Sequence, residues 1–595
     1  MSARRMDAWR MPAWRMPARR MNARRWSALT VAGFGFVVSF ALSWVPSLDF
    51  NEAATVVSAR RPWSAFWTEI HHVDAVHATY YAFMHLWLGV FGYTPMALRT
   101  PASIAAGVAA GLVVMLGSRL SGLRVGVAAG VVFAVLPITM WEGYWGREYE
   151  LTMALATGLV LLFLAARDRT LREERSWPWW LAFAVMAAAS QYVFGYLIMV
   201  CIGLAGSVAL PAIRRRPRAL SAMVRLGLAS AVAIAAWAPI ALLEMREKGQ
   251  VSWIPGLSAN TITGVLEVQY FQGSVPLAII GWTAAAVATI GGVWAWRRRA
   301  SAAGDASATA SPGASATGDA SATGGASATA SLVTICLPWL VVPTGILLVL
   351  TGFGAHVYVP RYVAFTAPAM ALLIAAPAAW IRWRPGLCTA SIVAVLLAIV
   401  APTWAAQRTP GAREADTWNT IAATVAAARK AEPAGARDAV VFGAAHAHKV
   451  ATSQVIADIY PAAFAGMTDV TLAVPYTKAS GLWSVGRPFT RALPSACGAD
   501  YIWVLATVES HQASAAIDVL SGSRYHVSRE WLFHGEQLVQ LAADTPRGIP
   551  RRRPRSRPAA GARQTARAAR AARAAPTAPT ARMTRITLAA TPLAP

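Results

Sequence analysis

The stretch SALTVAGFGFVVSFALSWVP at 27–46, followed directly by SLDFNEAAT at 47–55, decides the fold of this chain. Its first part is predominantly apolar over about 20 residues, which is the length that an α-helix needs to cross a hydrocarbon core of about 30 Å. Its second part brings two carboxylates, Asp49 and Glu52, to the end of that apolar run. The stretch therefore predicts a membrane span with ionisable side chains gathered at one end.

Apolar runs of this kind recur along the chain, and the composition agrees with them. Of the 595 residues, 56% are hydrophobic and only 14% are charged, and the mean hydropathy is +0.44. A soluble protein of this size would carry far more charge. We therefore predict an α-helical polytopic membrane protein with about 11 transmembrane helices, at 27–46, 100–118, 123–140, 151–165, 177–190, 193–212, 222–242, 275–295, 332–352, 363–381 and 387–404.

The formal net charge of +26 does not indicate a nucleic-acid partner. Most of the excess lies in two tails, because eight Arg precede Trp26 and twelve lie between Arg547 and Arg585. Neither tail has the aromatic or groove-reading pattern of a nucleic-acid-binding module. We expect a basic, disordered cytoplasmic leader at 1–26, beside the headgroups of membrane lipids, and a disordered Arg/Ala/Pro-rich tail at 546–595.

The distribution of Lys and Arg near the span ends predicts the orientation of the chain. With the N-terminus inside, the cytoplasmic segments hold 24 basic residues, whereas the opposite loops before residue 405 hold six. This bias predicts a multi-pass protein of the cytoplasmic (inner) membrane, with its N-terminus inside and the segment after the last span outside.

The spans define a transmembrane domain at 27–404, interrupted at 300–331 by a low-complexity cytoplasmic linker of small residues. A first external loop at 47–98 is expected to contain interfacial helices at Trp63–Glu69 and Tyr80–Phe91. Beyond the last span, 405–545 is expected to form a small C-terminal α/β domain outside the membrane. Its predicted elements are a helix at Trp418–Lys430 and strands at Ala439–Phe442, Val470–Val474 and Tyr501–Ala506.

Asp49 and Glu52 are three residues apart, so one helical turn would place both carboxylates on the same face. A carboxylate there could accept a proton from an attacking hydroxyl, which makes both residues candidate catalytic bases. The same spacing also fits a capping box, with Asp49 as the N-cap and Glu52 three positions into the helix. The residues alone leave both interpretations open.

A second polar cluster contains Asp74, His77 and Tyr81. These side chains could contact a substrate, or Asp74 and His77 could hold a divalent cation, or the segment could be a solvated interfacial loop. The spacing matches no specific zinc pattern, so the sequence predicts no definite cofactor and leaves a divalent cation as an alternative.

Two arginines lie beside aromatic residues in the opposite loops, Arg147 before Tyr149 and Arg361 before Tyr362. A guanidinium flanked by aromatic rings suits the phosphate of a lipid, which it can bind through two hydrogen bonds while stacking. The competing interpretation is an aromatic belt at the membrane interface, in which Arg147 pairs with a neighbouring glutamate.

The order of these clusters resembles the GT-C superfamily of membrane glycosyltransferases, in particular the actinobacterial family 39 branch related to protein O-mannosyltransferases. The resemblance covers about 27–405 and rests on short motifs. These motifs are Asn51-Glu52-Ala53-Ala54-Thr55, Asp74-x-x-His77 with Tyr80-Tyr81, His85-x-Trp87, Leu98-Arg99-x-Pro101-x-Ser103, Arg147-x-Tyr149 and Arg361-Tyr362. One position departs from the family, because Asn51 stands where the family has Asp. An amide cannot act as a base, so Asp49 or Glu52 would have to do so.

The resemblance implies a hexosyltransferase that moves a mannose-like sugar from a polyprenyl-phosphate-sugar donor to a cell-envelope acceptor at the outer face. The acceptor class, a glycan, a glycolipid or a protein, stays open. The implied roles are catalysis by Glu52 and Asp49, donor-phosphate binding by Arg147, Arg361, Tyr149 and Tyr362, and substrate binding by Asn51, Asp74, His77 and Tyr81.

Two other functions compete with this one. A lipid-linked sugar flippase or transporter would show inverted repeats and charged residues at the bilayer midplane, and the sequence shows neither. An inactive envelope scaffold is the third possibility, which the departure at Asn51 keeps open.

Overall fold

The structure is a computed structural model. It describes residues 18–213, 216–247, 249, 253–308, 320–381, 383–413, 417–446 and 448–544. Most of the predicted leader, the middle of the predicted linker and the predicted tail at 546–595 lie outside the described residues. Met1–Ala543 forms one compact unit, and the membrane helices and the C-terminal α/β domain both belong to it.

Each of the predicted membrane segments is helical. Among the described residues, seven stretches are long and apolar enough to cross a membrane, and the chain is a multi-pass membrane protein. They are α5 (Pro95–Ser121), α8 (Tyr149–Leu171), α11 (Pro217–Arg246), most of α14 (Val275–Ala308), most of α15 (Ala320–Gly352), the run Pro360–Trp380 built from η7 (Pro360–Thr366), α16 (Ala367–Ala375) and η8 (Ala376–Trp380), and α17 (Pro385–Ala406). The other predicted segments form α1 (Ala18–Phe40), α6 (Leu123–Ala134) with α7 (Pro137–Glu142), α9 (Trp177–Val193), and η4 (Gly195–Leu197) with α10 (Ile198–Ile213).

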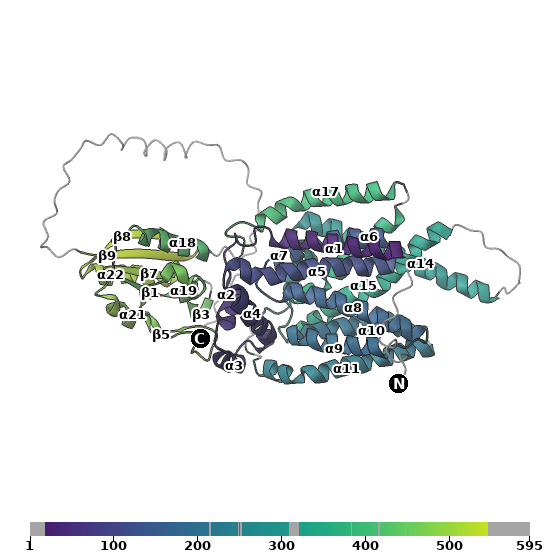
Figure 1. Cartoon of the computed structure of the whole chain (residues 1–595), viewed down its shortest axis with the longest axis horizontal. Helices are drawn as coiled ribbons and strands as arrows, with labels where there is room; N and C mark the ends of the chain where they lie inside the picture. The colour runs from purple at the N-terminus through teal and green to yellow at the C-terminus, as the bar shows by residue number, and fades with distance from the viewer. Residues whose placement is uncertain are drawn as a thin grey trace, which may run out of the picture. The chain divides into compact units, whose positions relative to one another are not determined.

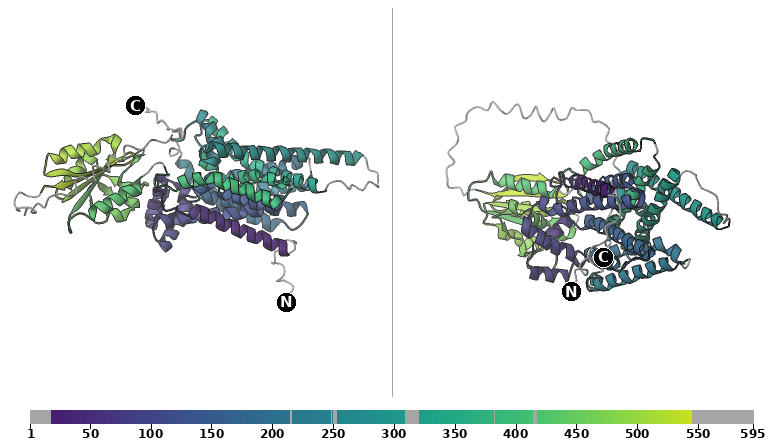
Figure 2. Two further views of the ribbon diagram at one scale, coloured as in Figure 1. Left: turned by 90° about the horizontal axis from the view of Figure 1, so that it is seen from above. Right: turned by 45° about the vertical axis from the view of Figure 1, so that its right-hand side comes forward.

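The long helices pack alongside one another, as Figures 1 and 2 show. Small residues allow a close approach between α1 and α5. A Cβ added to Gly107 would lie 2.7 Å from the carbonyl oxygen of Ala32, so only glycine fits at that crossing. Two of these helices, α14 and α15, extend into the predicted linker at 300–331, whose many alanines are strong helix formers.

Between α1 and α5, the chain forms three helices that pack over one end of the bundle (Figure 1). They are α2 (Phe50–Ala59), α3 (Trp63–Ile70) and α4 (Ala78–Phe91), and the turn η3 (Ala75–His77) precedes α4. The latter two helices coincide with the predicted interfacial helices. Their outward faces expose large apolar side chains, namely Trp63, Trp67, Phe83, Leu86, Val90 and Phe91. Two short helices, α12 (Ala259–Thr263) and α13 (Gln269–Phe271), with the π-helix η6 (Gly264–Val268) between them, precede α14.

The C-terminal α/β domain has a five-stranded sheet in the order β4-β1-β7-β9-β8. Strands β4, β1 and β7 are parallel, whereas β9 and β8 are antiparallel to their neighbours. Helices cover both faces of the sheet (Figure 2). Alternate residues of β1 and β7 point to opposite faces, and each set packs into its own hydrophobic core. The elements are α18 (Trp418–Arg429), β1 (Asp438–Phe442), β2 (Ala444–Ala445), β3 (His448–Thr452), α19 (Gln454–Ile459), α20 (Pro461–Phe464), β4 (Thr468–Asp469), β5 (Leu472–Val474), β6 (Val485–Gly486), α21 (Phe489–Ala492), η9 (Leu493–Ala496), β7 (Tyr501–Thr507), η10 (Val508–Ser510), α22 (Gln512–Ser521), β8 (Tyr525–Leu532) and β9 (Glu536–Ala543).

One predicted strand differs from the structure. The stretch Val470–Val474 is not a single strand, since β4 ends at Asp469 and β5 begins at Leu472. The side chain of Asp469 accepts hydrogen bonds from the backbone N–H groups of Thr471 and Leu472, at 2.8 and 3.0 Å. This local turn competes with the strand ladder and directs the chain out of the main sheet.

Candidate active site

The two carboxylates of the opening stretch begin α2 as a capping box. The side chain of Asp49 accepts from the backbone N–H of Glu52 at 2.8 Å, and the side chain of Glu52 accepts from the N–H of Asp49 at 3.3 Å. The capping interpretation of this spacing is therefore the geometry observed. Asp49 also lies 3.5 Å from Arg413, which follows the last membrane helix.

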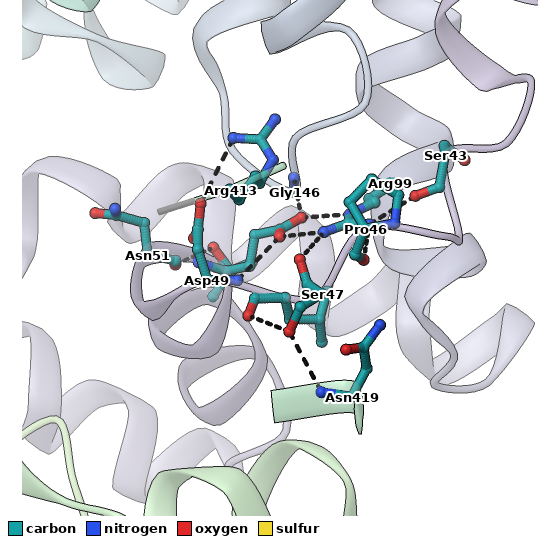
Figure 3. A network of polar contacts seen from close by, with 12 residues as sticks. Ser43, Pro46, Ser47, Asp49, Asn51, Arg99, Gly146, Arg413 and Asn419 are labelled. Carbon is teal, nitrogen blue, oxygen red and sulfur yellow. Dashed lines mark hydrogen bonds and ion pairs between the residues drawn. The ribbon is translucent and has the colours of Figure 1, made fainter. Parts of the chain in front are cut away.

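Glu52 is held further by a two-pronged ion pair with Arg99 of α5, shown in Figure 3. Arg99 donates from Nε to Oε1 at 2.7 Å and from Nη2 to Oε2 at 2.5 Å, and Gly146 donates its N–H to Oε1 at 2.9 Å. Arg99 holds the pKa of Glu52 below its usual value, although burial opposes this. Both side chains are fully buried.

The remaining donors of Arg99 bind the end of the first span. They contact the carbonyl oxygens of Ser43, Pro46 and Ser47 at 2.6–2.9 Å. All five N–H donors of this guanidinium are therefore used. In this arrangement Glu52 and Arg99 connect the first span, α2, α5 and the loop at Gly146. Glu52 accepts four hydrogen bonds, which favours a positioning role over that of a catalytic base.

Four predicted site residues meet in a chain of hydrogen bonds around Arg147. Its Nη1 donates to the hydroxyl of Tyr81 at 2.9 Å, and that hydroxyl donates to Asp74 at 2.9 Å. On the other side, Nη2 lies 2.6 Å from Nε2 of His77, whose Nδ1 lies 2.9 Å from Glu148. Burial raises the pKa of Glu148, but His77 and Arg147 outweigh it and lower the pKa to about 2.

This chain of contacts also reaches α2, and it thereby connects the cluster around Arg147 with the cluster around Glu52. Arg147 donates to the backbone carbonyl of Asn51 at 3.3 Å, next to Glu52, which accepts from Gly146. The side chain of Arg147 is only 4% exposed, so its guanidinium lies behind the surface that a ligand can reach. Asp74 and His77, in contrast, are half-buried.

The side chains predicted for a divalent cation contact other protein groups in this structure. Both ring nitrogens of His77 have partners, and Asp74 accepts the Tyr81 hydroxyl. Among the residues that the structure describes, no group of three or more His, Cys, Asp or Glu side chains could hold a metal ion.

The second predicted arginine, Arg361, lies among aromatic rings at the start of η7. Its guanidinium carbon is 5.5 Å from the ring centre of Trp145, 5.8 Å from that of Trp253 and 5.9 Å from that of Tyr362. Arg361 is half-buried. Tyr362 stacks on Tyr149 with ring centres 6.2 Å apart, so this aromatic site adjoins the backbone that carries Glu148 and Arg147.

The aromatic site and the hydrogen-bonded chain share one electrostatic environment. Both act on Glu142, whose side chain is 1% exposed. Burial raises its pKa to about 8, while Arg413 and Arg361 act in the opposite direction and Asp49 and Glu148 add to the rise. Every predicted site residue therefore belongs to one region, where α2, η3, α4, the 143–148 loop and η7 meet.

Sequence reasoning gave no role to several of these residues. Arg413 lies at the edge of the predicted α/β domain, yet its side chain is 1% exposed and its guanidinium stacks on Trp141, Tyr144 and Trp145, 4.4–4.7 Å from their ring centres. Nothing local in the sequence reveals this return of the chain. Arg99 had a signal, because a lone arginine near the start of an apolar helix needs a partner.

No protein-family model and no curated protein match this chain. Among solved structures, the chain is similar to apo ArnT from Cupriavidus metallidurans, with a TM-score of 0.52 and 12% identity over 87% of this chain and 98% of ArnT. The same protein bound to undecaprenyl phosphate gives a TM-score of 0.45 at 12% identity, over 86% and 97% of the two chains. The archaeal oligosaccharyltransferase AglB from Archaeoglobus fulgidus, in complex with an inhibitory peptide and a dolichol-phosphate, gives 0.43 at 10% identity, over 88% and 75%. The likeness to apo ArnT confirms the predicted fold.

Proposed function

We propose that this chain is a membrane hexosyltransferase. It moves a mannose-like sugar from a polyprenyl-phosphate-sugar donor to a cell-envelope acceptor at the outer face of the cytoplasmic membrane. The sequence resemblance to the actinobacterial branch related to protein O-mannosyltransferases supports this proposal, and so does the ArnT-like fold. The bias of basic residues supports the orientation.

One observation carries the proposal: a half-buried arginine among aromatic rings and a half-buried carboxylate lie at the two ends of one series of contacts, which runs from Tyr362 and Tyr149 to Arg147 and Tyr81. Arg361 is set among Trp145, Trp253 and Tyr362, and Asp74 is anchored through Tyr81 to Arg147. A cation for a leaving phosphate and a base for an attacking hydroxyl are the two groups that such a transfer needs.

The reaction follows from these two groups. The acceptor hydroxyl oxygen attacks the anomeric carbon of the donor sugar, and the bond between that carbon and the phosphate oxygen breaks. The electron pair of this bond leaves with the polyprenyl phosphate, whose added charge Arg361 stabilises. The hydroxyl proton passes to the carboxylate of Asp74.

The proposed roles differ from those expected for four residues, namely Glu52, Asp49, Arg147 and Asp74. Glu52 and Asp49 build the capping box and the ion pairs with Arg99 and Arg413, so we assign them to positioning. Arg147 holds Tyr81 and His77 in place, and it contributes positive charge to the site from behind. The proton acceptor is then Asp74, which lies closer to the surface.

A transfer assay tests the function. Membranes that contain the full-length protein are given a radiolabelled polyprenyl-phosphate mannose together with cell-envelope fractions as acceptor. We expect label to move to an acceptor, and we expect the Asp74→Asn and Arg361→Gln variants to lose this transfer. Translocation of the labelled lipid across the membrane without transfer would contradict the proposal and favour a flippase.

A further inference from the structure

A loop of the C-terminal α/β domain is fixed against the site region. This loop, residues 475–484, connects β5 and β6, which pair with each other as a two-stranded ribbon. The guanidinium of Arg61, from the turn between α2 and α3, donates to the carbonyl oxygens of Ala479 and Gly481 at 2.8 Å and of Leu482 at 2.6 Å. A single arginine therefore binds three backbone positions of the loop.

Arg61 itself is held rigidly. Its side chain is fully buried, and its Nε lies 3.1 Å from Glu69, which also accepts from the hydroxyl of Ser58 at 2.6 Å. A buried charge is costly unless all of its donors are satisfied. Here the loop accepts three hydrogen bonds from the two Nη atoms and Glu69 supplies the opposite charge beside Nε, so these contacts hold the loop against the turn between α2 and α3.

The anchored loop places Trp483 over the start of α2. The ring of Trp483 lies 4.4 Å from the ring of Phe50, centre to centre, at a tilt of 43°. Asn51 follows directly, and Figure 3 shows its amide pointing away from Arg99 and Gly146. Its backbone carbonyl accepts from Arg147, so the amide projects from a residue in direct contact with the candidate site.

Exposure distinguishes the residues that a ligand can touch from those that support them. Glu52, Tyr81, Arg147 and Glu148 are buried, whereas Phe50, Asn51 and Trp483 are half-buried like Asp74. Two aromatic rings with an uncharged amide beside them suit a neutral, hydroxyl-rich ligand. An aromatic face packs on the C–H face of a sugar ring, and an amide both donates to and accepts from vicinal hydroxyls.

We propose that Phe50, Asn51 and Trp483 form the acceptor site, and that the acceptor is a neutral glycan. This inference rests on the proposed function for the identity of the site, and it assigns the acceptor class that the function leaves open. Arg61 is the positioning residue, since it fixes the loop that carries Trp483.

Binding of sugars, measured without catalysis, tests this inference. Saturation-transfer difference NMR is recorded on the full-length protein in lipid nanodiscs with a panel of short neutral oligosaccharides. We expect binding to the wild type and to Trp483→Phe, and a loss of affinity of about ten-fold or more in Trp483→Leu, which keeps apolar volume but lacks a ring face. Trp67→Ala, on the exposed face of α3, is the matched control and keeps binding.

Two results would overturn the assignment. One is that no oligosaccharide of the panel receives saturation from the wild-type protein. The other is that Trp483→Leu binds as tightly as Trp67→Ala. The proposed function fails in a different way, if Trp483-dependent sugar binding is present but the wild type transfers no hexose from the polyprenyl-phosphate donor.

Discussion

Arg99 and Glu52 form a buried ion pair in which two nitrogens of the guanidinium each donate to one carboxylate oxygen, at 2.7 and 2.5 Å. This pair joins α5 to the first turn of α2, and its remaining donors fix the end of the first span. Glu52, which the sequence suggests as a catalytic base, is therefore part of the framework that positions the site.

Removing one partner of this pair should destabilise the protein strongly. We expect Arg99→Met to cost about 3–5 kcal/mol, because it leaves the charge of Glu52 buried and unpaired. The double variant Arg99→Met with Glu52→Gln should recover part of this loss. Thermal unfolding followed by fluorescence-detected size-exclusion chromatography measures both variants, and an unchanged melting temperature in Arg99→Met would contradict the framework role.

Arg361 and Arg147 should respond differently to the same substitution. Arg361→Gln should lower kcat by about 10²–10³-fold with little change in stability, because it removes stabilisation of the leaving phosphate. Arg147→Gln should lower both activity and melting temperature, because it breaks the contacts with Tyr81 and His77. The exposed Arg384→Gln serves as the control. Equal effects of the Arg361 and Arg147 variants on stability would argue against separate roles.

Asp74 should act on the chemical step. We expect Asp74→Asn to reduce the single-turnover rate by about 10²–10⁴-fold while donor binding stays within a few-fold of the wild type. Asn51→Asp, which puts a carboxylate into the proposed acceptor site, should not raise that rate, because the proton acceptor is already present. A large gain of rate in Asn51→Asp would show that the base belongs at position 51.

The fold was largely predictable because the signals for it are local. Apolar length marks the spans, and short motifs bring Asp74, His77, Tyr81 and Arg147 to one site. Contacts between distant segments were not predictable in this way. Arg413 contacts the site, and Arg61 donates hydrogen bonds to residues 479–482. Both contacts depend on how the α/β domain packs, which local sequence periodicity does not predict.

Strand prediction in the α/β domain had a similar limit. The edge strand β8 is exposed along most of its length, so it lacks the alternation that marks a half-buried strand. Its partner β9 is largely buried, yet it was also not recognised. The break after Asp469 arises from hydrogen bonds between its side chain and the backbone. The β-branched and apolar residues that follow are typical of a strand, so the sequence does not indicate this break.

Arg61 should control access to the 475–484 loop. In Arg61→Met, the three carbonyl contacts are lost, so limited trypsinolysis at the exposed Lys478 should become faster. The neighbouring Arg60→Met is the matched control, because the exposed side chain of Arg60 donates to the carbonyl of Asp458 at 3.2 Å and stacks on Tyr93, outside the 475–484 loop. Equal rates of cleavage in the two variants would show that the loop is held by other contacts.

The stability of the α/β domain should depend on pH through Glu536. Burial raises the pKa of this carboxyl to about 7 from a usual value of 4.5. A raised pKa in the folded state favours the protonated form, so the stabilisation is complete below pH 4.5 and is lost as the pH rises through 7. Glu536→Gln stays neutral, and its melting temperature relative to the wild type should therefore rise between about pH 5 and about pH 8. A constant difference across that range would refute this effect.

The position of a bound lipid phosphate tests the central claim most directly. Electron cryomicroscopy of the full-length protein with polyprenyl phosphate should place the phosphate oxygens about 3 Å from the guanidinium of Arg361, among Trp145, Trp253 and Tyr362. Phosphate density at another end of the helices, away from Arg361 and Asp74, would contradict the account.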